Sequence, residues 1–214
     1  MNSSFRKFAL LAAGLTLLVP KARAQLTMPE GGLLGKPYAG FDFTYDRYSG
    51  SSIDKALGIL TVVNIPVSAN VDVGVSYQFS DATGPFDGPT DNVLSGSILT
   101  FNRTPMGKAY FQTTLGHAWR QDNFLQRGTH ENGAFWTVRA GYEIPLGERS
   151  AANLGLGYSD GFGGGDYRDR TLQYHLEVNH WFTPVVAGVI GGHYSQIVGA
   201  PDYVTYSLGF RWRL

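Results

Sequence analysis

The sequence predicts an all-β chain that folds as a transmembrane antiparallel up-and-down β-barrel of ten strands, with eight strands as the alternative. Three observations predict this fold. Apolar and polar residues alternate with period two along most of the chain, short turns alternate with longer polar loops, and the last twelve residues alternate as well. Because successive side chains of a strand point to opposite faces, this alternation gives each strand one apolar and one polar face.

The N-terminal region is typical of a cleavable export signal. Arg6 and Lys7 precede the apolar run Phe8–Val19, which is too short to span a bilayer. The residues Ala22-Arg23-Ala24 then supply the small-x-small pattern of a cleavage site. The expected organisation is a signal peptide at 1–24 that is cleaved after Ala24, an N-terminal tail at 25–35 and the barrel at 36–214.

The composition excludes several classes of function. The chain has no cysteine, which excludes disulfides, thiolate metal sites and a thioether-linked lipid anchor. Loss of the signal peptide would remove four of the 17 Lys and Arg residues and leave 13 against 17 Asp and Glu, a net charge of −4. Nucleic acid is not expected as a partner, because phosphate binding needs clustered positive charge.

Ten segments are expected to be strands, of which 55–65 is apolar on both faces. The alternation is clearest in Val71–Phe79, where Val, Tyr and Phe at odd positions alternate with Asp72, Gly74, Ser76 and Gln78. The ten expected strands are 36–48, 55–65, 71–79, 93–102, 108–120, 133–144, 152–159, 170–182, 185–195 and 203–214.

The connections between these segments alternate in length. Short turns that carry Pro, Gly or Asn are expected at 66–70, 103–107, 145–150 and 183–184. Longer polar loops are expected at 49–54, 80–92, 121–132, 160–169 and 196–202. Short turns at one end and long loops at the other are typical of outer-membrane barrels, and an even strand count places both ends of the barrel domain on the short-turn side.

A soluble barrel also alternates, but its apolar face points inward. Here the polar faces carry small residues and isolated charges of both signs, which suits a narrow lumen better than a soluble surface rich in Lys and Glu. Aromatic residues gather toward the strand ends on the apolar faces, as in interfacial girdles. These features favour the membrane barrel.

Six charged residues on the polar faces are expected to face the lumen. We expect Arg139 to pair with Glu143 and Glu177 to pair with Arg211, so that these pairs plug and stabilise the interior rather than line a conducting pore. The six residues are Asp42, Asp72, Arg139, Glu143, Glu177 and Arg211.

Three segments carry a family resemblance. Tyr206–Leu214 resembles the C-terminal assembly signal of outer-membrane β-barrels, although the family usually ends on Phe or Trp and here Trp212 stands one pleat before Leu214. Ile65–Tyr77 resembles a periplasmic turn and the following strand of small porin-like and OmpA- or OmpX-like barrels, and Trp181–Pro184 is similar to another such turn. The resemblance implies a bacterial outer-membrane protein that contacts membrane lipid and lipopolysaccharide and is inserted by the barrel-assembly machinery.

One local pattern has a catalytic interpretation. His193-Tyr194-Ser195 is similar to the His-x-Ser of lipid A deacylase barrels, and period two places His193 and Ser195 on one face of a strand. Such a pair needs a third group to orient the imidazole, and in that family a Glu follows the Ser by about a dozen residues. No carboxylate stands there, and Asp202, the only nearby acid, lies in an expected loop. A polar pair at a strand end is therefore expected.

Neither a metal nor a cofactor is expected. The five histidines are dispersed, and the glycine-rich stretch Gly161–Gly165 lacks the Lys-Ser/Thr and the helix of a phosphate-binding loop. The sequence thus predicts a non-enzymatic outer-membrane barrel with a structural, envelope or surface-interaction role through its extracellular loops. The alternatives are a narrow porin that passes small solutes and a lipid A deacylase-like hydrolase.

Overall fold

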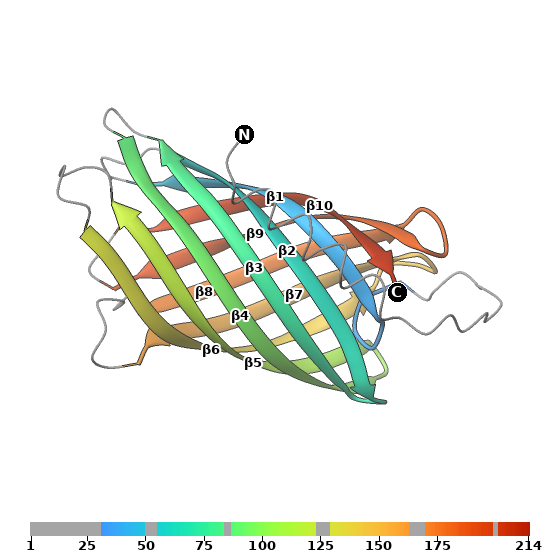
Figure 1. Ribbon diagram of the computed structural model, residues 1–214. Helices are drawn as coiled ribbons and strands as arrows, with labels where there is room; N and C mark the ends of the chain where they lie inside the picture. Colours follow the sequence, from blue (N-terminus) through green and yellow to red (C-terminus); the bar gives the residue numbers. More distant parts are fainter. Residues whose placement is uncertain (1–30, 50–54, 84–86, 123–128, 163–169, 199–200) are drawn as a thin grey trace.

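The computed structural model describes residues 31–49, 55–83, 87–122, 129–162, 170–198 and 201–214. The predicted signal peptide and its cleavage after Ala24 lie outside the described residues, as does most of the glycine-rich stretch. Ten antiparallel strands follow one another around a closed barrel, and the first strand pairs with the last (Figure 1). The expected fold class is confirmed, with ten strands rather than eight.

The strand bounds agree with the predicted segments in position, and several strands are longer than predicted. The strands are β1 (Tyr38–Tyr48), β2 (Lys55–Ser68), β3 (Val71–Thr83), β4 (Asp87–Thr104), β5 (Gly107–Asp122), β6 (Thr129–Pro145), β7 (Ser150–Gly161), β8 (Thr171–Trp181), β9 (Val186–Ile197) and β10 (Tyr203–Arg213).

Two expected loops were predicted too long. The segment 80–92 is mostly strand, because β3 and β4 keep pairing as far as Thr83 and Asp87. The segment 121–132 likewise shortens, since β5 and β6 pair as far as Asp122 and Thr129. Polar composition indicates contact with water, but the backbone ladder does not depend on side-chain polarity, so a hairpin can continue past the point where its apolar pattern stops.

The apolar faces of the strands point outward. Phe43, Leu208 and Ile190 lie side by side on β1, β10 and β9, and their side chains are between 56% and 61% exposed. A soluble barrel would bury such residues, whereas a bilayer covers them with acyl chains. Within the described part of the chain, no helix is long and apolar enough to cross a membrane.

Aromatic rings of neighbouring strands pack against each other in both halves of this outer face. In the half nearer the long loops, Tyr45 stacks on Tyr206 at a centroid distance of 6.4 Å and Tyr174 stacks on Tyr194 at 6.1 Å. In the half nearer the short turns, Phe41 contacts Trp212 at 5.6 Å. Amphipathic rings are favoured at the two interfaces of a bilayer, so these pairs are placed as girdle residues would be.

We expect Leu208→Arg to lower the free energy of unfolding by about 2–4 kcal/mol, because a charge in the middle of the lipid-facing belt must be desolvated. Urea unfolding of the protein in lipid vesicles measures the change. Val198→Arg is the matched control: Val198 is 72% exposed but follows β9 at the long-loop end, where water is close. Equal losses for both variants would contradict the placement of the membrane around the middle of the strands.

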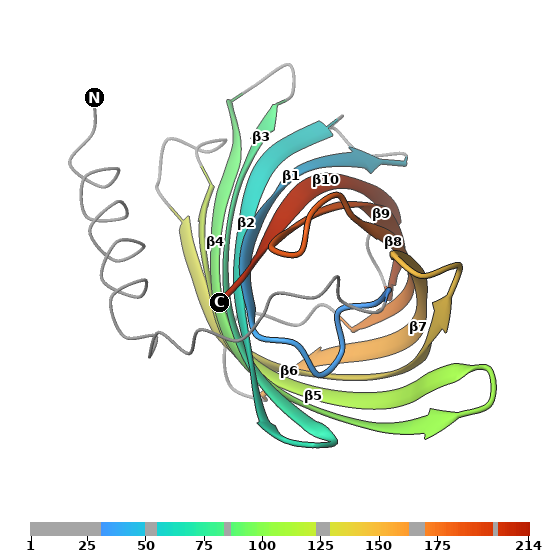
Figure 2. The same ribbon diagram turned by 90° about the vertical axis from the view of Figure 1, so that its right-hand side faces the viewer.

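A short segment before β1 lies inside the barrel. Residues 31–37, called the plug below, cross the lumen at the short-turn end (Figure 2, blue). Leu33 packs with Trp181, Ala187 and Val189 on one side of the lumen. Leu34 packs with Phe101 and Tyr110 on the other side. The lumen therefore has its own apolar core at this end, formed by the two plug leucines and by strand residues that face inward.

Candidate functional site

The centre of the plug is held by a carboxylate on β6. Glu143 Oε2 accepts hydrogen bonds from the backbone N–H groups of Leu33 at 2.6 Å and Leu34 at 3.1 Å. The same carboxylate forms a salt bridge with Lys108 Nζ at 3.1 Å, and Lys108 also donates to the carbonyl oxygen of Leu34 at 2.7 Å. Charge-assisted hydrogen bonds of this kind are stronger than neutral ones, so Glu143 and Lys108 clamp the centre of the plug.

A second anchor lies on β2 and β3. Asp72 Oδ2 accepts a hydrogen bond from the backbone N–H of Gly35 at 2.8 Å. The side-chain amide of Asn64 donates both to Asp72 at 3.1 Å and to the carbonyl oxygen of Lys36 at 3.0 Å. Both side chains are at most 9% exposed, so these polar contacts replace hydration that burial removes.

The start of the plug turns tightly against β8. Trp181 Nε1 donates to the carbonyl oxygen of Gly32 at 3.3 Å, and Lys36 Nζ donates to the same oxygen at 2.7 Å. Gly32 has φ +64°, and a Cβ atom there would lie 2.2 Å from Glu143 Oε1. Only glycine meets both the backbone conformation and the close approach of the carboxylate.

A buried ion pair lies above the plug. Arg211 forms a two-pronged contact with Asp42, with Nη1 to Oδ1 at 2.6 Å and Nη2 to Oδ2 at 2.9 Å. The pair fits because the flanking lumen positions are glycines: a Cβ at Gly209 would lie 1.8 Å from Asp42, and one at Gly40 would lie 2.5 Å from Arg211. Both charged side chains are less than 6% exposed, so each charge depends on the other to offset its loss of hydration.

The barrel encloses a cavity of about 470 Å³ that reaches from Leu33 and Leu34 of the plug to Tyr48 and Tyr203 at the long-loop end. Its wall is mainly polar. Four of the six predicted lumen residues line this cavity, and the other two, Asp72 and Glu143, are buried in the anchors of the plug. The four cavity-lining residues are Asp42, Arg139, Glu177 and Arg211.

The charge partners differ from the predicted ones. Glu143 pairs with Lys108, its direct neighbour across the β5–β6 ladder, rather than with Arg139. Residues four apart on one strand are about 13 Å apart, too far for a close contact between Arg139 and Glu143. Arg211 makes its salt bridge with Asp42 on the adjacent strand, whereas Glu177 interacts with Arg211 only over a longer range.

The His193–Ser195 pair faces the lumen, not the lipid. His193 lines the cavity and packs edge-on against the ring of Tyr203 at a centroid distance of 6.1 Å. The Ser195 side chain is fully buried, and its Oγ has no hydrogen-bond partner in the described part of the chain. Tyr194 between them points outward and donates to Asp202. A hydroxyl sealed in the wall and facing away from the bilayer cannot reach an acyl ester of a membrane lipid.

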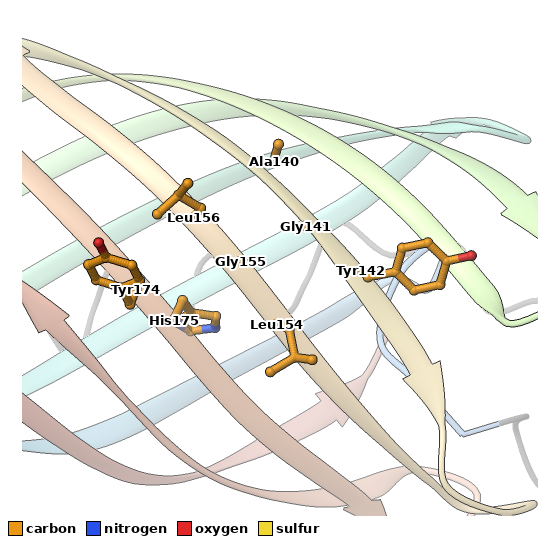
Figure 3. Close-up of a pocket in the computed structure, with 8 residues that line it drawn as sticks. All are labelled: Ala140, Gly141, Tyr142, Leu154, Gly155, Leu156, Tyr174 and His175. Atoms are coloured by element: carbon orange, nitrogen blue, oxygen red, sulfur yellow. The ribbon is translucent and has the colours of Figure 1, made fainter.

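A second, shallow depression lies on the outer face across β6, β7 and β8 (Figure 3). Tyr142 and Tyr174 stand at its two ends, and Leu154 and Leu156 lie between them. Its surface is almost entirely apolar and faces the same way as the lipid-facing belt, so acyl chains would fill it in a membrane. The candidate functional site is therefore the lumen: the plug, its anchors and the cavity above it.

Sequence reasoning missed most of the plug site. Lys108, Asn64 and Trp181 were not expected in it, and residues 25–35 were expected to form only a tail. A local signal was present, since Leu33 and Leu34 form an apolar pair between glycines directly before the first strand. Among the described residues, no group of three or more His, Asp or Glu side chains is arranged to hold a metal ion.

Comparison with known proteins finds similarity in structure alone. No protein-family model and no curated relative matches the chain. An outer membrane channel from Pseudomonas putida F1 is similar with a TM-score of 0.52 at 10% identity, over 92% of this chain and 100% of that one. Neisserial surface protein A reaches a TM-score of 0.48 at 13% identity, over 83% of this chain and 97% of that one. At such identities the likeness concerns the fold, and this chain has the fold of the transmembrane β-barrels of bacterial outer membranes.

Proposed function

We propose that this protein is a non-enzymatic outer-membrane β-barrel that is closed to solute flow and acts in the envelope or at the cell surface through its long-loop end. The plug carries this proposal. It crosses the lumen at the short-turn end, and the carboxylates of Glu143 and Asp72 hold its backbone N–H groups. A pathway through the barrel would have to displace these contacts together with the packing of Leu33 and Leu34.

The partners follow from the same proposal. The outward apolar belt would contact outer-membrane lipid, and the loops at the other end from the plug would meet lipopolysaccharide. Insertion would depend on the barrel-assembly machinery, with Tyr203–Arg213 as the closing strand. Export through a signal peptide at residues 1–24 remains part of this proposal.

A narrow porin is the second candidate, and the cavity of about 470 Å³ above the plug favours it. Conductance across planar bilayers separates the two candidates. We expect the unaltered protein to give no discrete current steps, because the plug and its anchors occupy the lumen at the short-turn end. Insertion is verified by flotation with lipid vesicles and by the change in gel mobility on boiling. Regular steps from a folded, inserted protein would establish the porin and overturn the closed barrel.

A further inference from the structure

Arg139 and Glu177 line the cavity and form no salt bridge within the described part of the chain, whereas Asp46, which also lines it, accepts a hydrogen bond from Thr205. Arg139 makes only a 3.4 Å contact from Nη2 to Gln173 Oε1, and its buried Nε has no hydrogen-bond partner. Glu177 lines the same cavity, and no salt bridge or hydrogen bond to its carboxylate is present among the described residues. By contrast, Asp42 is paired with Arg211 and Glu143 with Lys108. Charged groups that lack a salt-bridge partner in a narrow lumen are suited to binding a ligand.

The β7 glycines give Arg139 its position. Arg139, Gly157 and Gln173 occupy one row of the sheet across β6, β7 and β8. A Cβ atom at Gly155 would lie 3.2 Å from Arg139 Cδ, and one at Gly157 would lie 3.6 Å from its Nε. The arginine side chain therefore runs along the bare β7 backbone toward β8, with its guanidinium group at the cavity wall.

The groups next to Arg139 on β8 complete a polar recess. His175 lies two residues beyond Gln173 on the same face, and His193 is its direct partner across the β8–β9 ladder. Both histidines and Gln173 line the cavity. Glu177 follows two residues after His175, within electrostatic range of both Arg139 and Arg211. One wall of the cavity thus carries hydrogen-bond donors that suit an anion, followed by the carboxylate of Glu177.

We propose that this recess binds a small organic acid that carries a hydroxyl or ammonium group beside its carboxylate. The guanidinium group of Arg139 binds the ligand carboxylate, with Gln173 and His175 as neighbouring donors. The carboxylate of Glu177 accepts the hydrogen bond of the ligand's hydroxyl or ammonium group. A cavity of about 470 Å³ is of the size that holds such a ligand, which would enter from the long-loop end. This site is independent of whether the plug closes the barrel.

Isothermal titration calorimetry on the full-length mature barrel in detergent tests this site, with acetate, glycolate and glycine as probes and chloride as the reference at equal ionic strength. We expect glycine and glycolate to bind more tightly than acetate, and chloride to give no saturable signal. Arg139→Gln should weaken binding of all three acids about tenfold or more, because it removes the charged fork. Glu177→Gln should reduce the preference for glycine over acetate.

Arg103→Gln is the matched control, because Arg103 is an exposed arginine at the short-turn end of β4. It should leave all three titrations unchanged. Each variant is first checked for the change in gel mobility on boiling. If Arg139→Gln does not fold, Arg139→Lys is used instead. It keeps the positive charge but lacks the two-pronged hydrogen bonding of the guanidinium group, so it should still weaken binding. Binding that is absent for all three acids, or unchanged in the folded Arg139 variant, would overturn the proposal. An unchanged glycine preference in Glu177→Gln would remove Glu177 from the site.

Discussion

Replacing Glu143 by alanine should turn a silent barrel into a conducting one. The substitution removes the acceptor of the Leu33 and Leu34 N–H groups and leaves Lys108, whose side chain is 16% exposed, without its partner. Hydrogen bonds to a charged group contribute about 1.5–3 kcal/mol each, so the loss of two favours release of the plug by several kcal/mol. Discrete current steps in planar bilayers would report the release.

Glu148→Ala is the matched control for this experiment. Glu148 lies in the exposed turn that follows β6, five residues beyond Glu143, and its loss changes the net charge equally. It should leave the barrel silent. If the Glu143→Ala variant is folded and inserted but also gives no current steps, the plug is held without this carboxylate. In that case Asp72→Ala in the same background tests whether the second anchor suffices.

Breaking the buried ion pair of β1 and β10 should cause the largest loss of stability. Asp42→Ala leaves the guanidinium group of Arg211, whose side chain is 5% exposed, without its two-pronged acceptor. Loss of one partner of a buried pair costs about 3–5 kcal/mol, because the remaining charge stays desolvated. Urea unfolding in lipid vesicles measures this change. The pair also joins the first strand to the last, so closure of the barrel should weaken with it.

Two further variants serve as controls for the Asp42→Ala experiment. Asp42→Ala with Arg211→Met should recover much of the stability, since no buried charge then lacks a partner. Arg170→Ala breaks a pair with Asp160 in which the arginine side chain is 65% exposed, and it should cost no more than about 1 kcal/mol. Equal losses from the buried and the exposed pair would show that burial does not set the strength of the Asp42–Arg211 contact.

The strands could be predicted because their signal is local. Val71–Phe79 alternates so regularly that its existence and its two faces follow from the sequence alone, and β3 begins at the predicted residue. The ends of β3 to β6 at the long loops were predicted less well, because polar residues there still pair through their backbones. The orientation of His193 and Ser195 also follows a local rule: they share one face, and the apolar neighbours Ile190 and Tyr194 take the lipid-facing side.

By itself the sequence determined the fold class, the order of the strands and the polar and apolar faces of those strands that alternate cleanly, because period-two alternation reports local geometry. The segment 55–65 is apolar on both faces, and Leu60 and Val62 of β2 line the cavity. Only the tertiary structure decided the partners across the lumen. The Glu143 contact with the plug spans 110 residues, and the Asp42–Arg211 pair spans 169. Such contacts depend on strand register and on the closure of β1 against β10, which no local pattern encodes. The same physical limit explains why residues 31–35, which were expected to belong to a tail, lie inside the barrel against β6 and β9.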